Sequence, residues 1–284
     1  MKNLQQLSQR ATGQTERYRA FVRALLVILA ASAVAGCGGA DDTATSSDVT
    51  VAKKAVTVAK EPVTKEPVRT CVAGSTRRVG TARTTYAAVV QERAHAYRAP
   101  GSSRLASFGT KNVNGVATIF AVLAKRVDER CAAQWYRVQL PLKPNGSTGW
   151  VRAVDVELAP VTTRIEVDLS ERRVTLFDRG RRVLTATAAI GSPQTPTPTG
   201  RYYVNQRLVP TDASGPFGPG AIGISAFSEV LTGWTQGGPI AIHGTNRPDL
   251  LGRAVSNGCI RVRNDLLQRL FDRTRAGTPV TVRA

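Results

Sequence analysis

Residues 164–191, RIEVDLSERRVTLFDRGRRVLTATAAIG, decide the fold class of the C-terminal half of this chain. Ile165, Val167 and Leu169 alternate with polar residues, which is the period of a strand with one buried face. The polar segments SERR and DRGR interrupt the apolar residues and predict two turns. The stretch therefore predicts a meander of three strands in a mainly β fold.

The residues that follow the meander predict loops, one helix and a last strand. Residues 191–204, GSPQTPTPTGRYYV, contain three prolines, which cannot lie inside a central strand. The glycine-rich residues 216–230, PFGPGAIGISAFSEV, predict a loop or an edge region. Asn264 is a suitable N-cap for a helix that Gly277 closes, and PVTVRA ends the chain. One face of this helix carries Leu266, Leu267, Leu270 and Phe271.

The middle of the chain predicts a separate small β domain. Several short segments there are rich in β-branched and aromatic residues and are separated by turn sequences. We therefore expect a small β-barrel over residues 70–159, followed by a mostly β domain over residues 160–284 with one main helix near the C-terminus. The predicted strands of the barrel lie in TTYAAVVQ (84–91), ATIFAVLAKRV (117–127), QWYRVQLP (134–141) and GWVRAVDVEL (149–158).

Residues 1–69 predict targeting and a tether. Residues 1–36 hold a basic region and then the apolar run ALLVILAASAVA, which is too short to span a bilayer as a helix. The run ends in VAGC, which resembles the lipobox of bacterial lipoproteins, so Cys37 would become a lipidated N-terminus; an ordinary secretory signal is the alternative. Residues 37–69 are small, polar and charged, without aromatics, and predict a flexible tether.

The net charge of +19 at pH 7 points to anionic partners. Removing residues 1–36 takes away five basic residues and one acid and leaves +15. A basic intracellular protein would be a candidate for binding nucleic acid, but export argues against that partner. We expect an exported protein that meets the anionic cell wall and is held at the membrane through its N-terminal lipid.

The number and positions of the cysteines indicate that one of them is a free thiol. The chain has four cysteines, and export places them in an oxidising compartment. If Cys37 is lipidated, the simplest assignment of the other three is a disulfide between Cys71 and Cys131 with Cys259 free. The residues alone leave two alternatives for Cys259, which are an inert buried cysteine and a disulfide with Cys71 or Cys131.

His243 is the candidate partner of a reactive Cys259. It ends the apolar strand PIAIHGT, and a loop long enough to turn the chain back separates it from the cysteine. A thiol needs such a base, because the thiolate is the nucleophile. Gly258 permits a tight turn, and backbone N–H groups around it can bind a developing oxyanion. His95, within RAHAYRAPG, is expected on a turn in a surface role.

Other chemistries find little support in the sequence. One histidine in this half of the chain and no H-E-x-x-H motif argue against a zinc hydrolase, so we expect neither a metal nor a cofactor. There is no G-x-S-x-G motif and no phosphate-binding loop. Asp249 could orient His243, whereas Asp265 fits the start of the helix better.

Four motifs in the right order resemble the catalytic domain of L,D-transpeptidases, the YkuD-type fold. They are GSPQTPTPTGRYYV (191–204), GPGAIGISAF (218–227), IHGT (242–245) and SNGCIRV (256–262). The resemblance implies a mostly β domain that acts on peptidoglycan stem peptides, as donors and as acceptors. Cys259 would attack the bond before the terminal D-alanine to form a thioester, which the amine of a neighbouring stem resolves as a 3→3 cross-link.

The same resemblance assigns roles to the residues around the thiol. His243 would be general base and then acid, the Gly244 carbonyl would orient its ring, and Gly258 would belong to the oxyanion hole. Ser256, Asn257 and Arg261 would contact the substrate. The family often has histidine where this chain has Asn257, and an asparagine carries no proton at neutral pH, so His243 must act alone.

A second, more modest resemblance concerns the middle domain. WYRVQLP (135–141) and GSTGWV (146–151) are similar to the end of a bacterial Src-homology-3-like barrel. Such a barrel would serve as a spacer or wall-binding module. The alternatives to a transpeptidase are an L,D-carboxypeptidase, an enzyme that attaches another protein or amine to the wall, and a non-catalytic wall-binding lipoprotein.

Overall fold

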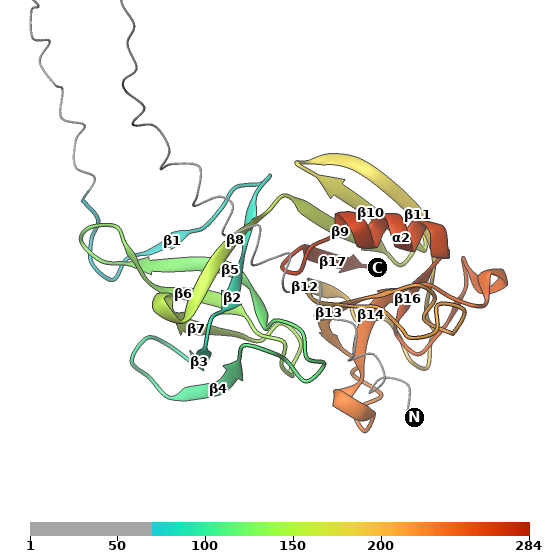
Figure 1. Ribbon diagram of the computed structural model, residues 1–284, viewed down its shortest axis with the longest axis horizontal. Coiled ribbons are helices and arrows are strands. Elements are labelled where there is room, and N and C mark those ends of the chain that lie inside the picture. Colours follow the sequence, from blue (N-terminus) through green and yellow to red (C-terminus); the bar gives the residue numbers. More distant parts are fainter. Residues whose placement is uncertain (1–69) are drawn as a thin grey trace, which may run out of the picture.

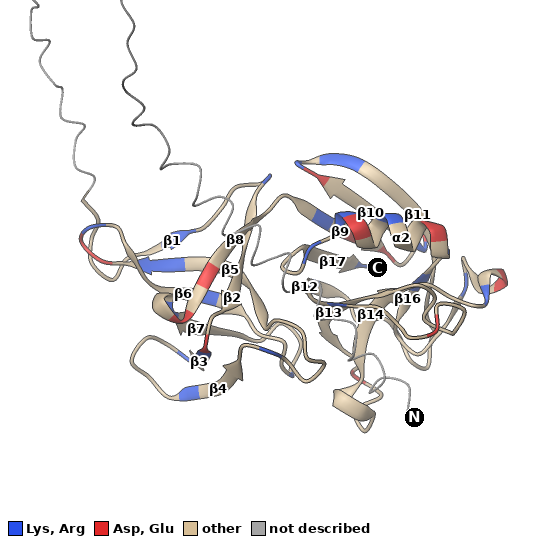
Figure 2. Cartoon of the chain, viewed as in Figure 1, with Lys and Arg blue, Asp and Glu red and all other residues tan. Residues whose placement is uncertain are grey.

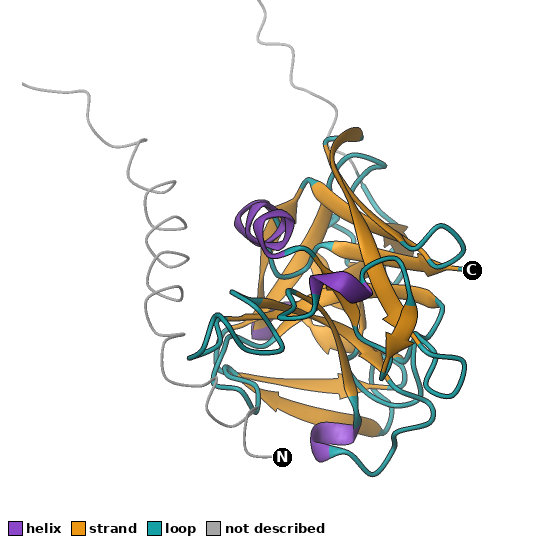
Figure 3. Ribbon diagram, turned by 90° about the vertical axis from the view of Figure 1, so that its right-hand side faces the viewer, coloured by secondary structure: helices purple, strands orange, loops and turns teal. Residues whose placement is uncertain are grey.

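The computed structural model describes residues 70–284 as two β domains that lie side by side (Figure 1). The predicted signal peptide (1–36), the tether (37–69) and Cys37 lie outside the described residues. Strands dominate the described chain, as Figure 3 shows, and α2 is its one α-helix. Lysine and arginine occur on both domains (Figure 2). No helix within residues 70–284 has the length and apolarity needed to cross a membrane.

The first domain is a single sheet that curls into a small β-barrel. Its strand order is β4-β3-β7-β6-β5-β2-β8, and β1 pairs with β5. Phe120, Val138 and Leu140 are among its fully buried side chains. The elements are β1 (Thr76–Arg78), β2 (Thr85–Val90), β3 (Arg93–Tyr97), β4 (Arg104–Gly109), β5 (Ile119–Val127), β6 (Ala133–Gln139), β7 (Thr148–Arg152), the 3-10 turn η2 (Ala153–Asp155) and β8 (Val156–Val161).

A disulfide ties the start of the described chain to this barrel. Cys71 is bonded to Cys131 in the β5–β6 turn, with their Cα atoms 5.2 Å apart, while Cys259 is a free thiol. His95 lies within strand β3 instead of on a turn, because its neighbours Ala94 and Ala96 face the barrel core. Its Nδ1 lies 2.8 Å from the hydroxyl of Ser107 on the paired strand, so it is a surface residue of the sheet.

The second domain is a nine-stranded sheet that closes on itself. Its order is β10-β9-β17-β12-β13-β14-β16-β11-β15, and β10 also pairs with β11. The predicted meander is confirmed as three antiparallel strands, β9 to β11. The elements are β9 (Thr163–Asp168), β10 (Arg173–Asp178), β11 (Arg181–Gly191), β12 (Gly200–Leu208), β13 (Ala221–Phe227), η3 (Thr235–Gly237), β14 (Pro239–His243), η4 (Pro248–Leu250), β15 (Ala254–Ser256), β16 (Ile260–Val262), α2 (Asn264–Arg273) and β17 (Pro279–Arg283).

Two predictions for this domain were wrong. Residues 221–227, expected in a loop or at an edge, form the central strand β13, because the alanine and isoleucine residues on both of its faces are buried. Helix α2 begins one residue earlier than predicted, so Asn264 is its first residue and not its cap. The helix ends at Arg273 and is followed by an extended Thr274, so Gly277 does not close it.

Gly277 instead lies at the junction of the two domains. A single residue, Thr162, separates β8 from β9. The Gly277 backbone has φ +93°, and a Cβ atom there would lie 2.3 Å from the Cβ of Ala87 in strand β2. Ala87, Ile119 and Val161 of the first domain form a small apolar cluster against which Ala276 packs. The absence of a side chain at Gly277 therefore lets the two domains approach each other.

Replacing Gly277 with alanine is expected to weaken this junction. The new Cβ overlaps Ala87, and overpacking costs roughly 1–3 kcal/mol beyond the strain of a left-handed backbone. Gly101→Ala is the matched control, because Gly101 has φ +78° but nothing within 4 Å of the new Cβ. Urea unfolding should show a clearly larger loss of unfolding free energy for Gly277→Ala than for Gly101→Ala. Adding Ala87→Gly to Gly277→Ala should restore part of this loss. Equal losses for the two alanine variants would contradict this account.

Candidate active site

Cys259 and His243 come from two neighbouring parallel strands. Strand β14 pairs with β16 so that Ile242 faces Ile260 and His243 faces Arg261. Side chains alternate along a strand, so Cys259, two residues before Arg261, lies on the same face as Arg261 and its partner His243. Diagonal neighbours of this kind have Cβ atoms about 7–8 Å apart, within reach of a thiol and an imidazole. The fold thus brings together the two residues that the motifs singled out.

The His243 ring is held in one orientation. The imidazole is buried, and its Nδ1 lies 2.6 Å from the Gly244 carbonyl oxygen. Because a carbonyl can only accept, Nδ1 carries the proton and Nε2 keeps its lone pair. The Phe217 ring packs against the imidazole with centroids 4.9 Å apart. Asp249 does not orient His243, because its exposed carboxylate binds Arg247 at 2.8 Å.

Burial makes both reacting groups neutral at rest. It lowers the pKa of His243 to about 4, an effect that the positive charge of Arg261 reinforces and the Gly244 hydrogen bond opposes. Burial raises the pKa of the Cys259 thiol, while a backbone hydrogen bond from Ala241 and the charge of Arg261 favour the thiolate. At neutral pH the site therefore holds a thiol beside an imidazole that is free to take its proton.

Hydrogen bonds of Ser256 brace the turn from Ser256 to Cys259 internally. The Ser256 hydroxyl is buried; it donates to the Cys259 carbonyl at 2.5 Å and accepts from the Gly258 N–H at 3.1 Å. Ser256 therefore shapes the turn, and its predicted contact with a substrate stays a prediction. Since the Gly258 N–H is already bonded, it is not a free oxyanion donor in this structure. Gly258 has φ +105°, and a Cβ there would lie 2.9 Å from Ile240.

The proline-rich loop of the motif at residues 191–204 supports the same turn, through side chains to which the sequence assigned no role. The buried Thr197 hydroxyl donates to the Gly258 carbonyl at 2.9 Å and accepts from the Gly191 N–H at 2.9 Å. Thr195 donates its hydroxyl to the Ser256 carbonyl at 2.9 Å. The prolines of this segment have no N–H to bond, so the threonine hydroxyls and the Ser192 N–H, which donates to the Ser256 carbonyl at 2.9 Å, link it to the cysteine turn.

Helix α2 supports the histidine side of the site. The Asn264 side-chain carbonyl accepts from the Thr245 N–H at 2.7 Å. A Cβ at Gly244 would lie 2.3 Å from this oxygen and 3.0 Å from the Gly218 backbone. The glycine after His243 is therefore required by close packing, which the IHGT motif alone did not reveal. Phe217 was likewise missed, because the glycines and prolines around it read as a loop.

The other two residues that are predicted to contact the substrate, Arg261 and Asn257, differ in their surroundings. Arg261 is half-buried, shares the face of His243 and Cys259, and has an Nε atom that is buried without a hydrogen-bond partner within residues 70–284. Asn257 is exposed at the tip of the cysteine turn, and its side chain makes no hydrogen bond within the described part of the chain. Both side chains are thus available to a ligand.

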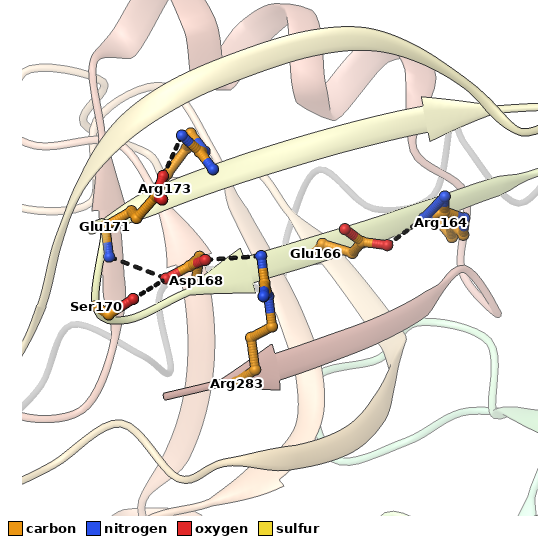
Figure 4. A network of polar contacts seen from close by, with 7 residues as sticks. All are labelled: Arg164, Glu166, Asp168, Ser170, Glu171, Arg173 and Arg283. Atoms are coloured by element: carbon orange, nitrogen blue, oxygen red, sulfur yellow. Dashed lines mark hydrogen bonds and ion pairs between the residues drawn. The ribbon is translucent and has the colours of Figure 1, made fainter.

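A hollow in the described part of the chain lies away from Cys259 and His243. It has a volume of about 410 Å³ on the face of β9, β10 and β17, and none of the predicted site residues lines it. Figure 4 shows the ion pairs of this face, including Asp168 with Arg283 at 2.7 Å. In residues 70–284, no group of three or more His, Cys, Asp or Glu side chains is placed to bind a metal ion.

The second domain is similar in sequence to known proteins that have a named catalytic domain. Residues 162–282 match the family model of the L,D-transpeptidase catalytic domain, YkuD. The predicted resemblance of this domain to L,D-transpeptidases is thereby confirmed.

Individual relatives cover the same part of the chain. The putative L,D-transpeptidases YkuD of Bacillus licheniformis and Bacillus subtilis are each 34% identical, over 119 and 118 residues. The alignments span 42% of this chain and 64% of each relative, which is just under two thirds of their length. A solved structure of a mutant Enterococcus faecium L,D-transpeptidase is 28% identical, covers 43% of this chain and 49% of that one, and has a TM-score of 0.33.

The buried neutral imidazole predicts a pH-dependent stability. Between the folded pKa of about 4 and an unfolded value of about 6.5, the unfolded chain binds one proton more than the folded chain. The contribution of the neutral His243 to the free energy of unfolding is therefore complete above pH 6.5. Roughly 2–3 kcal/mol of this contribution is lost by pH 4.5. Urea unfolding of the wild type and of His243→Gln at pH 7, 5.5 and 4.5 measures this. The same pH dependence in both proteins would contradict a neutral buried imidazole.

Thr197→Val tests the brace between the proline loop and the cysteine turn. Valine keeps the shape but leaves the Gly191 N–H and the Gly258 carbonyl buried without their partner, which should cost about 2 kcal/mol or more. Alkylation of Cys259 should also become slower or less uniform. Thr199→Val, at an exposed hydroxyl of the same loop, is expected to stay within about 0.5 kcal/mol of the wild type. Similar unfolding free energies for both variants would contradict this role.

Proposed function

We propose that this protein is a peptidoglycan L,D-transpeptidase that forms 3→3 cross-links between stem peptides through a Cys259 thioester. The observation that carries the proposal is the shared face of β14 and β16, where the thiol and an imidazole of fixed orientation are diagonal neighbours. The match of residues 162–282 to the L,D-transpeptidase catalytic domain supports the substrate class.

The reaction begins with two neutral groups. His243 Nε2 takes the thiol proton as the sulfur attacks the carbonyl carbon of the third stem residue, so that charge separates only when a substrate is present. The resulting oxyanion needs backbone donors. Because Ser256 occupies the Gly258 N–H, we assign this role first to the N–H of Cys259.

The second half of the reaction reverses these proton transfers. The imidazolium gives its proton to the leaving amine, D-alanine departs, and the acyl group remains on sulfur as a thioester. His243 then takes a proton from the side-chain amine of a neighbouring stem, which attacks the thioester and releases the thiol. Arg261, with its unpartnered Nε on the same face, would bind a carboxylate of the stem peptide.

The location of this activity follows from the sequence. The basic leader, the apolar run and the cysteine at position 37 support export and lipidation, so that the enzyme would be held at the membrane and act in the wall above it. The first domain would serve there as a Src-homology-3-like spacer or wall-binding module. The positive charge of the chain suits the anionic polymers of that compartment.

Incubation with a disaccharide-tetrapeptide tests the proposal. We expect mass spectrometry to detect free D-alanine together with a cross-linked dimer, and Cys259→Ala to abolish both products. Release of D-alanine without any dimer would identify an L,D-carboxypeptidase instead, since water would then be the acceptor. Turnover that persists in Cys259→Ala would contradict the assignment of the nucleophile.

A β-lactam of the carbapenem type should acylate the same thiol, as the family resemblance implies. Intact-mass measurement should show one adduct on the wild type, because the strained ring offers a carbonyl to the same nucleophile. Cys259→Ser is the control, and an adduct that persists in this variant would place the reaction at another residue.

A further inference from the structure

The loop between β13 and β14 (residues 228–238) leads directly into the strand that serves the thiol. Strand β14 supplies His243, the Ala241 backbone that bonds the Cys259 side chain, and Ile240, which packs against Gly258. Any movement of the loop that shifts β14 would therefore displace all three of these groups relative to the cysteine turn. The first domain touches this loop at both of its ends.

Asn145 of the first domain holds the start of the loop. Its side-chain carbonyl accepts from the Phe227 N–H at 2.9 Å, and its amide donates to the Phe227 carbonyl at 2.8 Å. Phe227 is the last residue of β13 and pairs with Pro239, the first residue of β14. A single asparagine thus bonds both backbone groups of the residue that aligns the beginning of the catalytic strand.

Asn114, in a different loop of the first domain, holds the other end. Its side chain and that of Gln236 exchange two hydrogen bonds, at 3.0 and 3.4 Å. The same Asn114 amide donates to Gln206 of β12 at 2.8 Å, and a second donor to Gln206 is Asn112 at 3.0 Å. Asn114 and Gln206 are buried, so these amides would be costly to leave unpaired.

The loop needs such support from outside. Gln236, Gly237 and Gly238 all have positive φ angles, of 60°, 78° and 72°, and the left-handed conformation is unfavourable for glutamine. Val230 and Trp234 are 53% and 52% exposed and anchor the loop weakly, while Leu231 is half-buried. The buried Ser228 hydroxyl accepts from the Val230 and Leu231 N–H groups near the start of the loop, and the hydrogen bonds to the first domain hold the loop from outside.

We propose that Asn114 and Asn145 are positioning residues, through which the first domain holds strand β14 in the register that Cys259 requires. The proposal rests on the proposed function for the identity of the nucleophile. It makes the first domain a part of the catalytic unit, in addition to any role as a spacer. Neither asparagine contacts the reacting atoms; each acts through the β13–β14 loop.

The reactivity of the thiol reports this positioning directly. The charged and titratable groups that face Cys259 are His243 on β14 and Arg261 on β16. The Ala241 hydrogen bond favours the thiolate, so displacement of β14 raises the pKa of the thiol. The rate of alkylation, followed against pH, therefore separates a loss of positioning from a general loss of stability.

The experiment compares iodoacetamide alkylation of the purified chain with that of its variants. The extent of modification is read at the Cys259 peptide by mass spectrometry across a pH series, and no peptidoglycan is needed, so the outcome is independent of the substrate. The variants are Asn145→Ala, Asn114→Ala and their combination. Gln139→Ala is the matched control, because Gln139 donates to the Arg201 carbonyl across the same junction at 2.7 Å but does not touch the loop.

We expect the double variant to react more slowly at pH 7, on the order of tenfold, with the midpoint of its profile at higher pH. Gln139→Ala should keep the wild-type dependence of alkylation on pH. Its decrease in Tm for each lost hydrogen bond should be similar to that of the asparagine variants. A wild-type profile in a folded double variant would overturn the proposal.

Hydrogen exchange provides a second test, should the double variant unfold. The amides of Ser228 and Gly237 are bonded within the loop, to Gly238 and Trp234. In either single variant these amides should exchange faster, while the amides of β9 and β10 keep their protection. Unchanged exchange at both positions would show that the asparagines do not hold the loop and would overturn the proposal as well.

Discussion

The parallel pairing of β14 with β16 is the constraint on which the site depends. Ile242 and Ile260 form one pair of this register and are fully buried in the core, which leaves His243 and Cys259 on the opposite face. A shift of β16 by one residue would exchange its two faces, turn the thiol away from the imidazole and place an isoleucine side chain there instead. The register that places the reacting groups is thus fixed by apolar side chains that take no part in the chemistry.

The same burial that fixes the register sets the protonation of the pair. In water an imidazole and a thiol would each be easier to ionise than they are here, where desolvation favours the neutral forms. Arg261 is the nearby charge, and it disfavours an imidazolium while favouring a thiolate. The site therefore suits a proton transfer that accompanies attack. In the proposed function, with Asn257 beside the cysteine, His243 would carry out the whole transfer.

The sequence predicted those parts of the molecule that repeat a local pattern. Alternation identified β9 to β11, and the spacing of His243 and Cys259 within their motifs identified the reacting pair. It did not predict β13, whose glycines resemble a loop, or the braces made by Thr197 and Asn264, which bond backbone groups 61 and 19 residues away. The sequence did not single out Asn114 or Asn145, because a contact across a domain junction leaves no periodic signal.

The link between the domains is one residue long, and this has a geometric consequence. Thr162 joins β8 to β9, and buried contacts close the junction on both sides of it, so the chain has no slack there for a hinge. A connection of one residue gives the two domains little freedom to separate. In the proposed function, the enzyme would therefore form cross-links only close to the surface on which its first domain rests.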